Sequence, residues 1–352
     1  MPDLDSLKFI AQIDRQNMGS RLCVVSEEMK KIVASAKTIK VPKQWQRVSN
    51  IAIIGMGASG IGGEIVKNIA SQRISMPIEV INDYELPAYI GKGSLVFCVS
   101  FSGETEETIT AADRALKQKA NLFIITKEDS SLGKFARKNK IRTFRVTAPP
   151  PPRLALMNLL IPILFILEKL RLVVNIKEQL EQTVPLIQKT IDEIQEKRPT
   201  KNNLAKRLAL ELSQTIPVVI TSPAISSVGQ RFVQQINEDA KRYAFYKTSP
   251  ELNHNFIEAI SRKNSYLFTI IKSSFDSPSV QRAHSSLESI LKARKIPYEI
   301  ILLQGRNLLS QIFFGITLLD FTSFYIALLN QENPSYNLTI DLYKKELKEK
   351  QK

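Results

Sequence analysis

Residues 51–71 read IAIIGMGASGIGGEIVKNIAS, and this stretch predicts the fold of the chain. Ile51 to Ile54 form a short apolar run rich in β-branched residues, which is typical of a buried strand. Glycines follow at once, and the apolar residues from Ser59 to Ser71 have helical spacing. A strand, a glycine turn and a helix in this order form the first unit of an α/β fold with a parallel sheet.

The same order of strand and helix continues through the first half of the chain. Helical spacing is present in residues 4–40, before the first strand. After that strand the sequence predicts four more, at 78–81, 95–99, 122–126 and 143–146. These strands are continuous apolar runs that alternate with helical stretches, so they predict a parallel sheet with helices on both faces.

A second series of strands follows a helical segment. Pro149 to Pro152 interrupt any element, and residues 154–207 are almost wholly helical in pattern. Strands are then predicted at 218–220, 243–246, 266–271 and 298–302. We also predict a helix through 253–260 and two closing helices at about 308–329 and 338–350.

The two series of strands predict an α/β protein with two flavodoxin-like parallel-sheet domains and flanking helices. The expected N-terminal domain covers residues 1–150 and includes the leading helices. A helical connector is expected at 151–205, and a C-terminal domain with closing helices at 206–352.

The composition fits a globular protein that needs neither disulfides nor a metal to fold. The chain has 352 residues, of which 43% are hydrophobic and 24% charged, and this mixture argues against a disordered or fibrous protein. Two cysteines are too few for a disulfide framework and favour a reducing compartment. With only two histidines beside them, a zinc site would have to draw on distant parts of the chain, so no metal is expected.

The chain is strongly basic. Its 49 Lys and Arg against 34 Asp and Glu give a net charge of +15, which favours an anionic partner such as a phosphorylated metabolite, a nucleic acid or a membrane surface. Most basic residues are interspersed with acids, and the one dense acid-free stretch, 134–145, is interrupted by Phe135, Ile141 and Phe144. This distribution is typical of solvated surfaces, so no nucleic-acid partner is expected.

The sequence predicts neither secretion nor a membrane span. It begins Met-Pro-Asp-Leu-Asp, which is acidic where a signal peptide is basic. The longest apolar run, 154–167, contains Asn158 and Pro162 and is shorter than the roughly 20 residues that cross a bilayer. A second run, 311–329, carries Asp320 near its centre. We expect buried helices in a cytoplasmic protein without a membrane partner.

The glycine loop at 55–60 fits the Gly-x-Gly-x-x-Gly pattern of dinucleotide-binding folds and stands between a strand and a helix. Such folds also place an acidic residue about 20 positions further on to hold the ribose. The candidate here, Asp83, lies further along the chain than that. No lysine follows the loop as it does in a nucleotide P-loop. A nicotinamide dehydrogenase is therefore the weaker hypothesis, and no cofactor is expected.

A second loop, Ser100-Phe-Ser102-Gly-Glu-Thr105-Glu-Glu-Thr108, follows the third predicted strand and opens a helix. Its four hydroxyls and the free N–H groups of the helix start can surround a phosphate monoester, because phosphate accepts several hydrogen bonds and prefers the positive end of a helix. The alternative is that these residues only cap the helix.

Together the two loops resemble the sugar isomerase (SIS) domain, and in particular the bifunctional phosphoglucose/phosphomannose isomerase family. The matching segments are Gly57-Ala-Ser59-Gly60-Ile-Gly62-Gly63, Ser100 to Thr108, Pro152-Arg153-Leu-Ala-Leu, Asn237-Glu238-Asp-Ala-Lys241, Glu251-Leu-Asn253-His254-Asn255 and the tail from Asn333 to Lys344. They occur in the family's order over about residues 45–350, so the resemblance implies two SIS-type domains.

The chain departs from the family's pattern at Ala58, Phe101, Glu104, Phe256 and Ser335. Of these residues, Glu104 bears most directly on function. A carboxylate near a phosphate-binding loop repels the ligand unless it points away.

The resemblance implies that the chain converts glucose 6-phosphate, and also mannose 6-phosphate, to fructose 6-phosphate through an enediol intermediate. This reaction belongs to glycolysis and gluconeogenesis. The residues that the resemblance assigns to substrate binding are Gly57, Ser59, Ser100, Ser102 and Thr105.

The resemblance also implies four catalytic residues. Glu238 is expected to move a proton between C2 and C1, and His254 to open the sugar ring, since histidine titrates close to neutrality. Arg153 is expected near the enediolate oxygens, and Lys344 lies in the Lys-rich tail. Each has a plainer alternative: a solvated helix surface for Glu238, a polar loop for His254, and surface positions for Arg153 and Lys344.

The resemblance further implies a homodimer in which His254 reaches the site of the partner subunit. A non-catalytic SIS protein that binds sugar phosphates and acts as a regulator is the alternative function. Such sensors commonly carry a DNA-binding module, and residues 1–45 show neither helix-turn-helix spacing nor a concentrated basic face.

Overall fold

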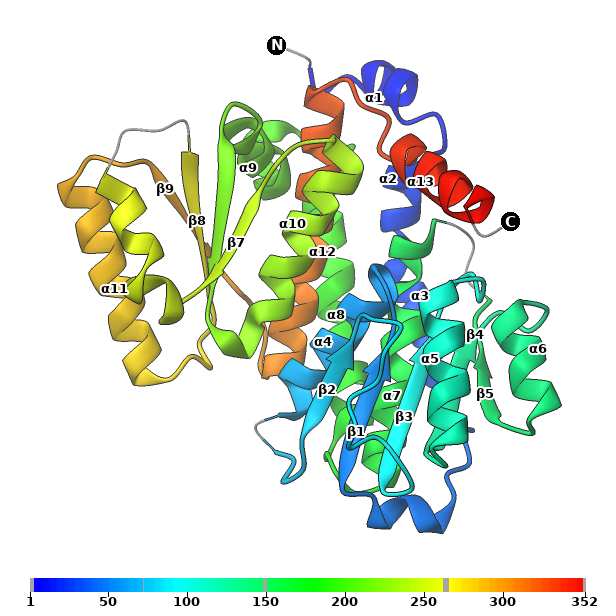
Figure 1. The fold of residues 1–352 in the computed structure, drawn as a ribbon. Coiled ribbons are helices and arrows are strands. Elements are labelled where there is room, and N and C mark those ends of the chain that lie inside the picture. Colours follow the sequence, from blue (N-terminus) through cyan, green and yellow to red (C-terminus); the bar gives the residue numbers. More distant parts are fainter. Residues whose placement is uncertain (1–2, 72, 148–150, 262–265, 351–352) are drawn as a thin grey trace.

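Two separate parallel β-sheets are joined by a layer of helices (Figure 1). The structure is a computed structural model that describes residues 3–71, 73–147, 151–261 and 266–350. In Figure 1 the first sheet lies at the lower right and the second at the left. The helices between them are α8 (Ile176–Ile194), α10 (Ser226–Ala240) and α12 (Leu308–Leu329).

The first sheet has five parallel strands in the order β2-β1-β3-β4-β5, which is the flavodoxin-like order. The strands are β1 (Asn50–Ile54), β2 (Ile78–Ile81), β3 (Ser94–Val99), β4 (Asn121–Thr126) and β5 (Arg142–Arg145). The helices of this half are α3 (Val25–Ala36), α4 (Ala58–Ala70), α5 (Glu106–Lys117), α6 (Ser131–Lys138) and α7 (Leu156–Lys169).

Both faces of the first sheet are covered, because its strands carry apolar residues on both sides. Phe97 and Phe123 pack on the face that also buries α3, α4 and α7. Val96 and Cys98 pack on the opposite face, against alanines of α5 and α6. The alternation of strand and helix in the sequence therefore produces a three-layer arrangement.

The second sheet repeats this arrangement with four parallel strands in the order β7-β6-β8-β9. Its strands are β6 (Ile216–Thr221), β7 (Phe245–Thr248), β8 (Tyr266–Lys272) and β9 (Tyr298–Leu302). The other helices of this half are α9 (Leu204–Ser213), α11 (Pro278–Ala293) and α13 (Leu338–Glu349). The predicted fold class, two parallel-sheet α/β units with flanking helices, is confirmed; β7 is displaced from its predicted bounds by two residues and β5 by one.

The leading helical segment, residues 4–40, is broken into α1 (Leu7–Ile13), α2 (Met18–Leu22) and α3. The break lies at Asn17, which has a left-handed backbone with φ of 54°. The Asp14 carboxylate then accepts hydrogen bonds at 2.8 and 2.9 Å from the N–H groups of the first residues of α2. A short side chain that captures free N–H groups competes with a continuous helix at this point.

Two further helical predictions need correction. The segment 154–207 is divided where Arg171 and Asn175 have left-handed backbones, and Glu168 accepts a hydrogen bond at 2.6 Å from the N–H of Ile176, the first residue of α8. The helix predicted through 253–260 is instead a pair of 3₁₀ helices, η5 (Glu251–His254) and η6 (Phe256–Ser261). Of the predicted proline break, Pro149 and Pro150 lie outside the described residues.

Helix α12 is the central helix of the core. It is the one helix in the described ranges that is long and apolar enough to cross a membrane by length and composition. Nearly all of it is buried inside the protein, against α8, α9 and α10. Such burial on every side accounts for its apolar sequence without a bilayer.

Candidate active site

The two loops singled out in the sequence lie at the same edge of the first sheet. Strands β1 and β3 are parallel neighbours, and each ends in a loop that opens a helix. Gly57, with φ of 51°, precedes α4, and Gly103, with φ of 69°, lies in the turn before α5. The strand order reverses between β1 and β3, and such a crevice is where open α/β sheets bind ligands.

The hydroxyls of the second loop have different surroundings. The Ser100 side chain is buried, is hydrogen-bonded to the Thr105 hydroxyl at 3.0 Å and accepts the N–H of Gly103 at 3.0 Å. Ser102 is exposed and accepts the N–H of Glu104 at 3.2 Å. Ser100 therefore shapes the loop, while Ser102 faces solvent. Thr105 is half-buried at the start of α5, where the N–H groups of the first turn lack helical partners.

The Glu104 carboxylate is directed toward α6. Its two oxygens accept hydrogen bonds from the N–H and the hydroxyl of Ser131, at 2.8 and 2.6 Å. Ser131 is the first residue of α6, so the negative charge lies at the positive end of that helix. The departure from the family's pattern at this position thus places a carboxylate in a stabilising contact of its own.

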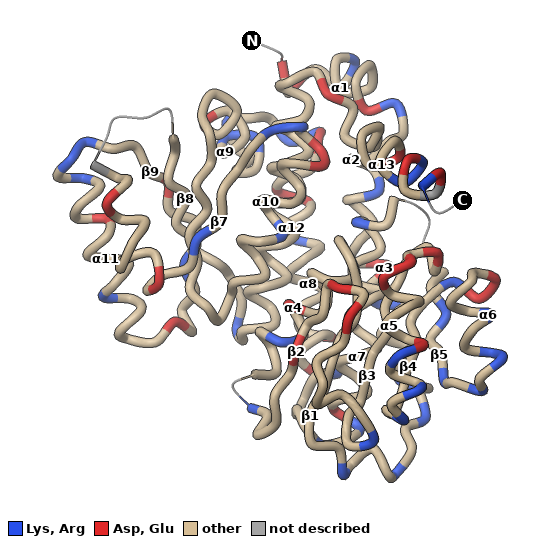
Figure 2. The backbone as a smooth tube through the Cα atoms, in the orientation of Figure 1, with Lys and Arg blue, Asp and Glu red and all other residues tan. Residues whose placement is uncertain are grey.

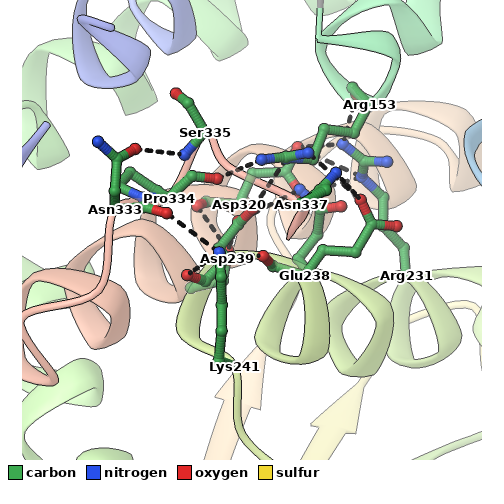
Figure 3. A network of polar contacts seen from close by, with 12 residues as sticks. Arg153, Arg231, Glu238, Asp239, Lys241, Asp320, Asn333, Pro334, Ser335 and Asn337 are labelled. Atoms are coloured by element: carbon green, nitrogen blue, oxygen red, sulfur yellow. Dashed lines mark hydrogen bonds and ion pairs between the residues drawn. The ribbon is translucent and has the colours of Figure 1, made fainter. Parts of the chain in front are cut away.

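The predicted catalytic residues Glu238 and Arg153 lie next to each other (Figure 3). Glu238 lies in the last turn of α10, with 28% of its side chain exposed. Arg153 comes from the 3₁₀ helix η2 (Pro152–Ala155), immediately before α7, and its side chain is almost completely buried. Its Nη1 lies 3.3 Å from Oε2 of Glu238.

Asp239 is a member of the site that the sequence reasoning did not identify. It is fully buried, its Oδ1 lies 2.9 Å from Nε of Arg153, and its Oδ2 accepts a 2.9 Å hydrogen bond from the Ser323 hydroxyl. Burial raises the pKa of the Asp239 carboxyl to about 7, and the charge of Arg153 acts in the opposite direction. Asp239 therefore holds the Arg153 guanidinium from the side facing the core.

A second buried ion pair supports the first. Arg231 of α10 donates from Nε and Nη2 to Asp320 of α12 at 2.9 and 2.7 Å. Arg231 also donates from Nη2 to the backbone carbonyl of Arg153 at 3.0 Å. Burial raises the pKa of the Asp320 carboxyl, and Arg231 opposes this effect. The charge of Asp320 in an otherwise apolar helix was the sequence signal for this pair, because a buried charge needs a partner.

The chain segment before α13 completes the site. Arg153 donates from Nη2 to the carbonyl of Pro334. Lys241 donates to the carbonyls of Glu238 at 2.7 Å and of Asn333 at 3.0 Å. With its amide oriented to satisfy its neighbours, Asn337 accepts a hydrogen bond from Nη1 of Arg153 at 2.9 Å. Figure 3 shows these residues around the Arg153 guanidinium.

The structure does not bring His254 to this network. His254 is exposed at the end of η5, and within the described part of the chain no hydrogen bond or ion pair joins it to Glu238 or Arg153. Its exposure leaves the imidazole free to contact a group outside this chain.

Lys344 is exposed on α13, the closing helix of the chain. In Figure 1, α13 lies above α5. The preceding residue, Tyr343, contributes with Glu106 and Glu107 of α5 to the electrostatic environment of Tyr84, whose pKa is raised mainly by desolvation. The side chains of Leu338, Leu342 and Tyr343 are 63–70% exposed, so this helix has an uncovered apolar surface.

The arrangement combines a base, a fixed cation and an anion-binding edge. A carboxylate such as Glu238 can accept and return a proton, and a buried guanidinium can stabilise negative charge that develops on substrate oxygens. Among the described side chains, no group of three or more His, Cys, Asp and Glu could hold a metal ion. These residues could support proton transfer with electrostatic stabilisation.

Two family models match the chain. One is described as the SIS domain and matches residues 46–170; the other is described as the bacterial phospho-glucose isomerase C-terminal SIS domain and matches residues 201–347. A bifunctional phosphoglucose/phosphomannose isomerase of Caldicellulosiruptor bescii is 30% identical over 92% of this chain and 96% of its own. Another, of Thermoplasma acidophilum, is 29% identical over 85% of this chain and 90% of its own.

The fold is also similar to solved structures. A hypothetical protein from Thermus thermophilus superimposes with a TM-score of 0.74 at 14% identity, over 97% of this chain and 94% of that one. At that level of identity the likeness bears on the fold alone, and it matches the pair of parallel sheets in Figure 1.

Proposed function

Because this chain belongs to the bifunctional phosphoglucose/phosphomannose isomerase family, we propose that it converts glucose 6-phosphate and mannose 6-phosphate to fructose 6-phosphate through an enediol. The observation that carries the proposal is the 3.3 Å approach of the Arg153 guanidinium to the Glu238 carboxylate. The alternative of a non-catalytic sugar-phosphate regulator has no support among the relatives reported above, both of which are named as isomerases.

The phosphate of the substrate binds at the loops after β1 and β3. The exposed Ser102 hydroxyl, the Thr105 hydroxyl and the N–H groups that open α4 and α5 supply hydrogen bonds to the phosphate oxygens. Gly57 and the buried Ser59 belong to the first of these helix starts, and Ser100 keeps the second loop in shape. Phosphate binding here holds the sugar at the edge of the sheet that faces the catalytic pair.

Glu238 transfers the proton and Arg153 stabilises the intermediate. The Glu238 carboxylate removes the proton from C2 of the open-chain aldose, and the negative charge that develops on the oxygens at C1 and C2 is stabilised by Arg153. The hydroxyl proton at O2 moves to O1, and return of the carbon-bound proton from Glu238 to C1 gives the ketose. Asp239 positions Arg153 from the core, so the guanidinium is fixed before the substrate arrives.

His254 opens the sugar ring from the partner subunit of a homodimer, and Lys344 is the fourth proposed catalytic residue. The exposure of His254 and the uncovered apolar surface of α13 support an arrangement in which a second copy completes the site. We place the enzyme in the cytoplasm, in glycolysis and gluconeogenesis, and assign it no membrane or nucleic-acid partner.

A coupled assay tests the proposal. Fructose 6-phosphate formation is measured from glucose 6-phosphate and, separately, from mannose 6-phosphate. We expect activity on both, a loss of at least about a thousandfold for Glu238→Gln, and wild-type activity for Glu193→Gln, which changes an exposed glutamate of α8. Binding of both sugar phosphates without turnover would instead establish the regulator.

A further inference from the structure

A second concave site lies beside the edge strand of the first sheet. Residues of α3, α7 and β5, together with the chain on either side of β5, line a pocket of about 650 Å³. None of the residues assigned above to the sugar phosphate lines it. Its volume lies within the range of about 300–1,000 Å³ that is typical of small-molecule sites.

The pocket is basic. Lys31, Lys40, Arg142 and Arg145 line it, and no Asp or Glu does. Arg145 is paired with Glu128 at 2.9 Å. In the described ranges no carboxylate lies within ion-pair distance of Lys31, Lys40 or Arg142, although the charge of Lys31 acts on Glu28 at longer range. Figure 2 shows the blue segments along this edge of the sheet.

A buried polar side chain also lines the pocket. Asn158 interrupts the apolar sequence of α7, and it is 5% exposed. No described residue forms a hydrogen bond with its amide. The amide therefore borders the cavity, where a polar group of a ligand can form hydrogen bonds with it in place of water.

The remaining lining is mixed: five residues are apolar, two of them aromatic, and four carry hydroxyls, namely Ser35, Thr38, Thr143 and Thr147. Phe123 is buried at the base of the pocket region, and Phe144 of β5 is half-buried. Ile32, Ile39 and Ile141 complete this side. A ligand that is only a phosphate ion or a short sugar phosphate leaves this apolar surface unused.

We propose that this pocket binds a nucleoside phosphate. The aromatic base packs against Phe144 and the isoleucines, and Asn158 exchanges hydrogen bonds with its polar edge. The phosphates interact with Lys31, Lys40 and Arg142, because clustered cations without carboxylate partners favour an anion. The basic stretch at 134–145 and the polar Asn158 within an apolar helix, two features of the sequence that the isomerase site does not use, meet at this pocket.

Calorimetric titration of the full chain with ADP tests the proposal. The experiment is run with saturating fructose 6-phosphate, which occupies the phosphate loops. We expect one saturable ADP site per chain, and at least tenfold weaker binding of adenosine and of pyrophosphate, which each lack half of the recognised groups. The double variant Lys31→Ala, Arg142→Ala and the variant Asn158→Leu are each expected to bind ADP at least tenfold more weakly.

Matched controls separate the pocket from general charge. Arg137→Ala and Lys138→Ala change the same basic stretch outside the pocket lining, and we expect unchanged ADP affinity. Arg142 is exposed, so its variant folds even where Asn158→Leu does not. The proposal is overturned by the absence of saturable ADP binding at millimolar concentration, by pocket variants that bind normally, by loss of ADP binding in Ser102→Ala, or by binding of a single-stranded oligonucleotide in place of ADP.

Discussion

Nε of Arg153 lies 2.9 Å from Oδ1 of Asp239, and both side chains are almost completely buried. Taking a guanidinium and a carboxylate out of water is costly, and removal of one partner leaves an uncompensated charge. The pair therefore positions the Arg153 guanidinium, because Asp239 fixes this cation beside Glu238.

The stability of the protein depends on the protonation of Asp239. Its raised folded pKa, about 7, exceeds that of an unfolded aspartate, about 4, so the folded state binds the proton more tightly. The contribution of this group to the free energy of unfolding is full below pH 4 and falls as the pH rises to 7. We expect wild type to lose stability over this window relative to Asp239→Asn, measured by denaturant unfolding. If the difference in the free energy of unfolding between wild type and Asp239→Asn is constant with pH, the prediction is contradicted. Asp192→Asn, at an exposed position, is the control.

Removal of loop hydroxyls weakens phosphate binding. In Ser102→Ala, Thr105→Ala the affinity for fructose 6-phosphate and for inhibitors that carry a phosphate is expected to fall together, by about 1–3 kcal/mol per lost bond. Thr110→Ala, on the same helix but past its first turn, is the matched control and is expected to bind normally. Calorimetry measures the affinities of both variants. An unchanged affinity in the double variant would show that this loop does not bind the phosphate.

Glu104 stabilises the loop rather than repelling the substrate. Its contacts with the N–H and hydroxyl of Ser131 hold the carboxylate at the start of α6. We expect Glu104→Ala to lower the free energy of unfolding by about 0.5–1.5 kcal/mol while KM stays within about twofold. The conservative variant Glu104→Gln is expected to retain part of the stability. A KM that drops severalfold in Glu104→Ala would reveal repulsion instead.

We predict that Glu238 and His254 perform separate steps from different subunits. Glu238→Gln is expected to abolish exchange of the C2 proton with solvent, even on a substrate offered in open-chain form. His254→Ala is expected to regain activity on that substrate, since the ring is already open. Equal failure of both variants on the open-chain substrate contradicts this division of roles.

Mixing the two inactive variants tests the sharing of the site. Random exchange of subunits makes about half of the dimers mixed, and each mixed dimer has one site with both Glu238 and His254, so about a quarter of wild-type activity is expected to return. If His254 acts within its own chain, no mixed dimer has an intact site and no activity returns. Size-exclusion chromatography establishes the dimer independently.

The strands could be predicted from the sequence because a buried parallel strand is a short apolar run with glycines or helical stretches on either side of it. It did not predict the breaks at Asn17 and Asn175, because a left-handed backbone at one residue does not change the helical spacing of the apolar residues around it. Family resemblance, not spacing, assigned Arg153 and Glu238 to one site, because 85 residues separate them in the chain; their direct contact was not predicted.

Asp239 and Arg231 were missed for a physical reason. In the sequence both stand in α10 among ordinary polar residues, and only the packing of α12 against this helix buries them. Asp320 gave a stronger signal, because a lone charge within an apolar helix requires a partner, although the sequence does not name that partner. The roles of His254 and Lys344 stay predictions, since both side chains are exposed on the surface of the single chain.

The carbonyls of Pro334 and Asn333 accept hydrogen bonds from Arg153 and Lys241, so residues near the end of the chain hold a catalytic group contributed by its middle. A chain that stops before residue 333 keeps Arg153 and Glu238 but lacks the groups that orient the guanidinium. We therefore expect such a chain to be inactive even where it folds, because its guanidinium is no longer held in place.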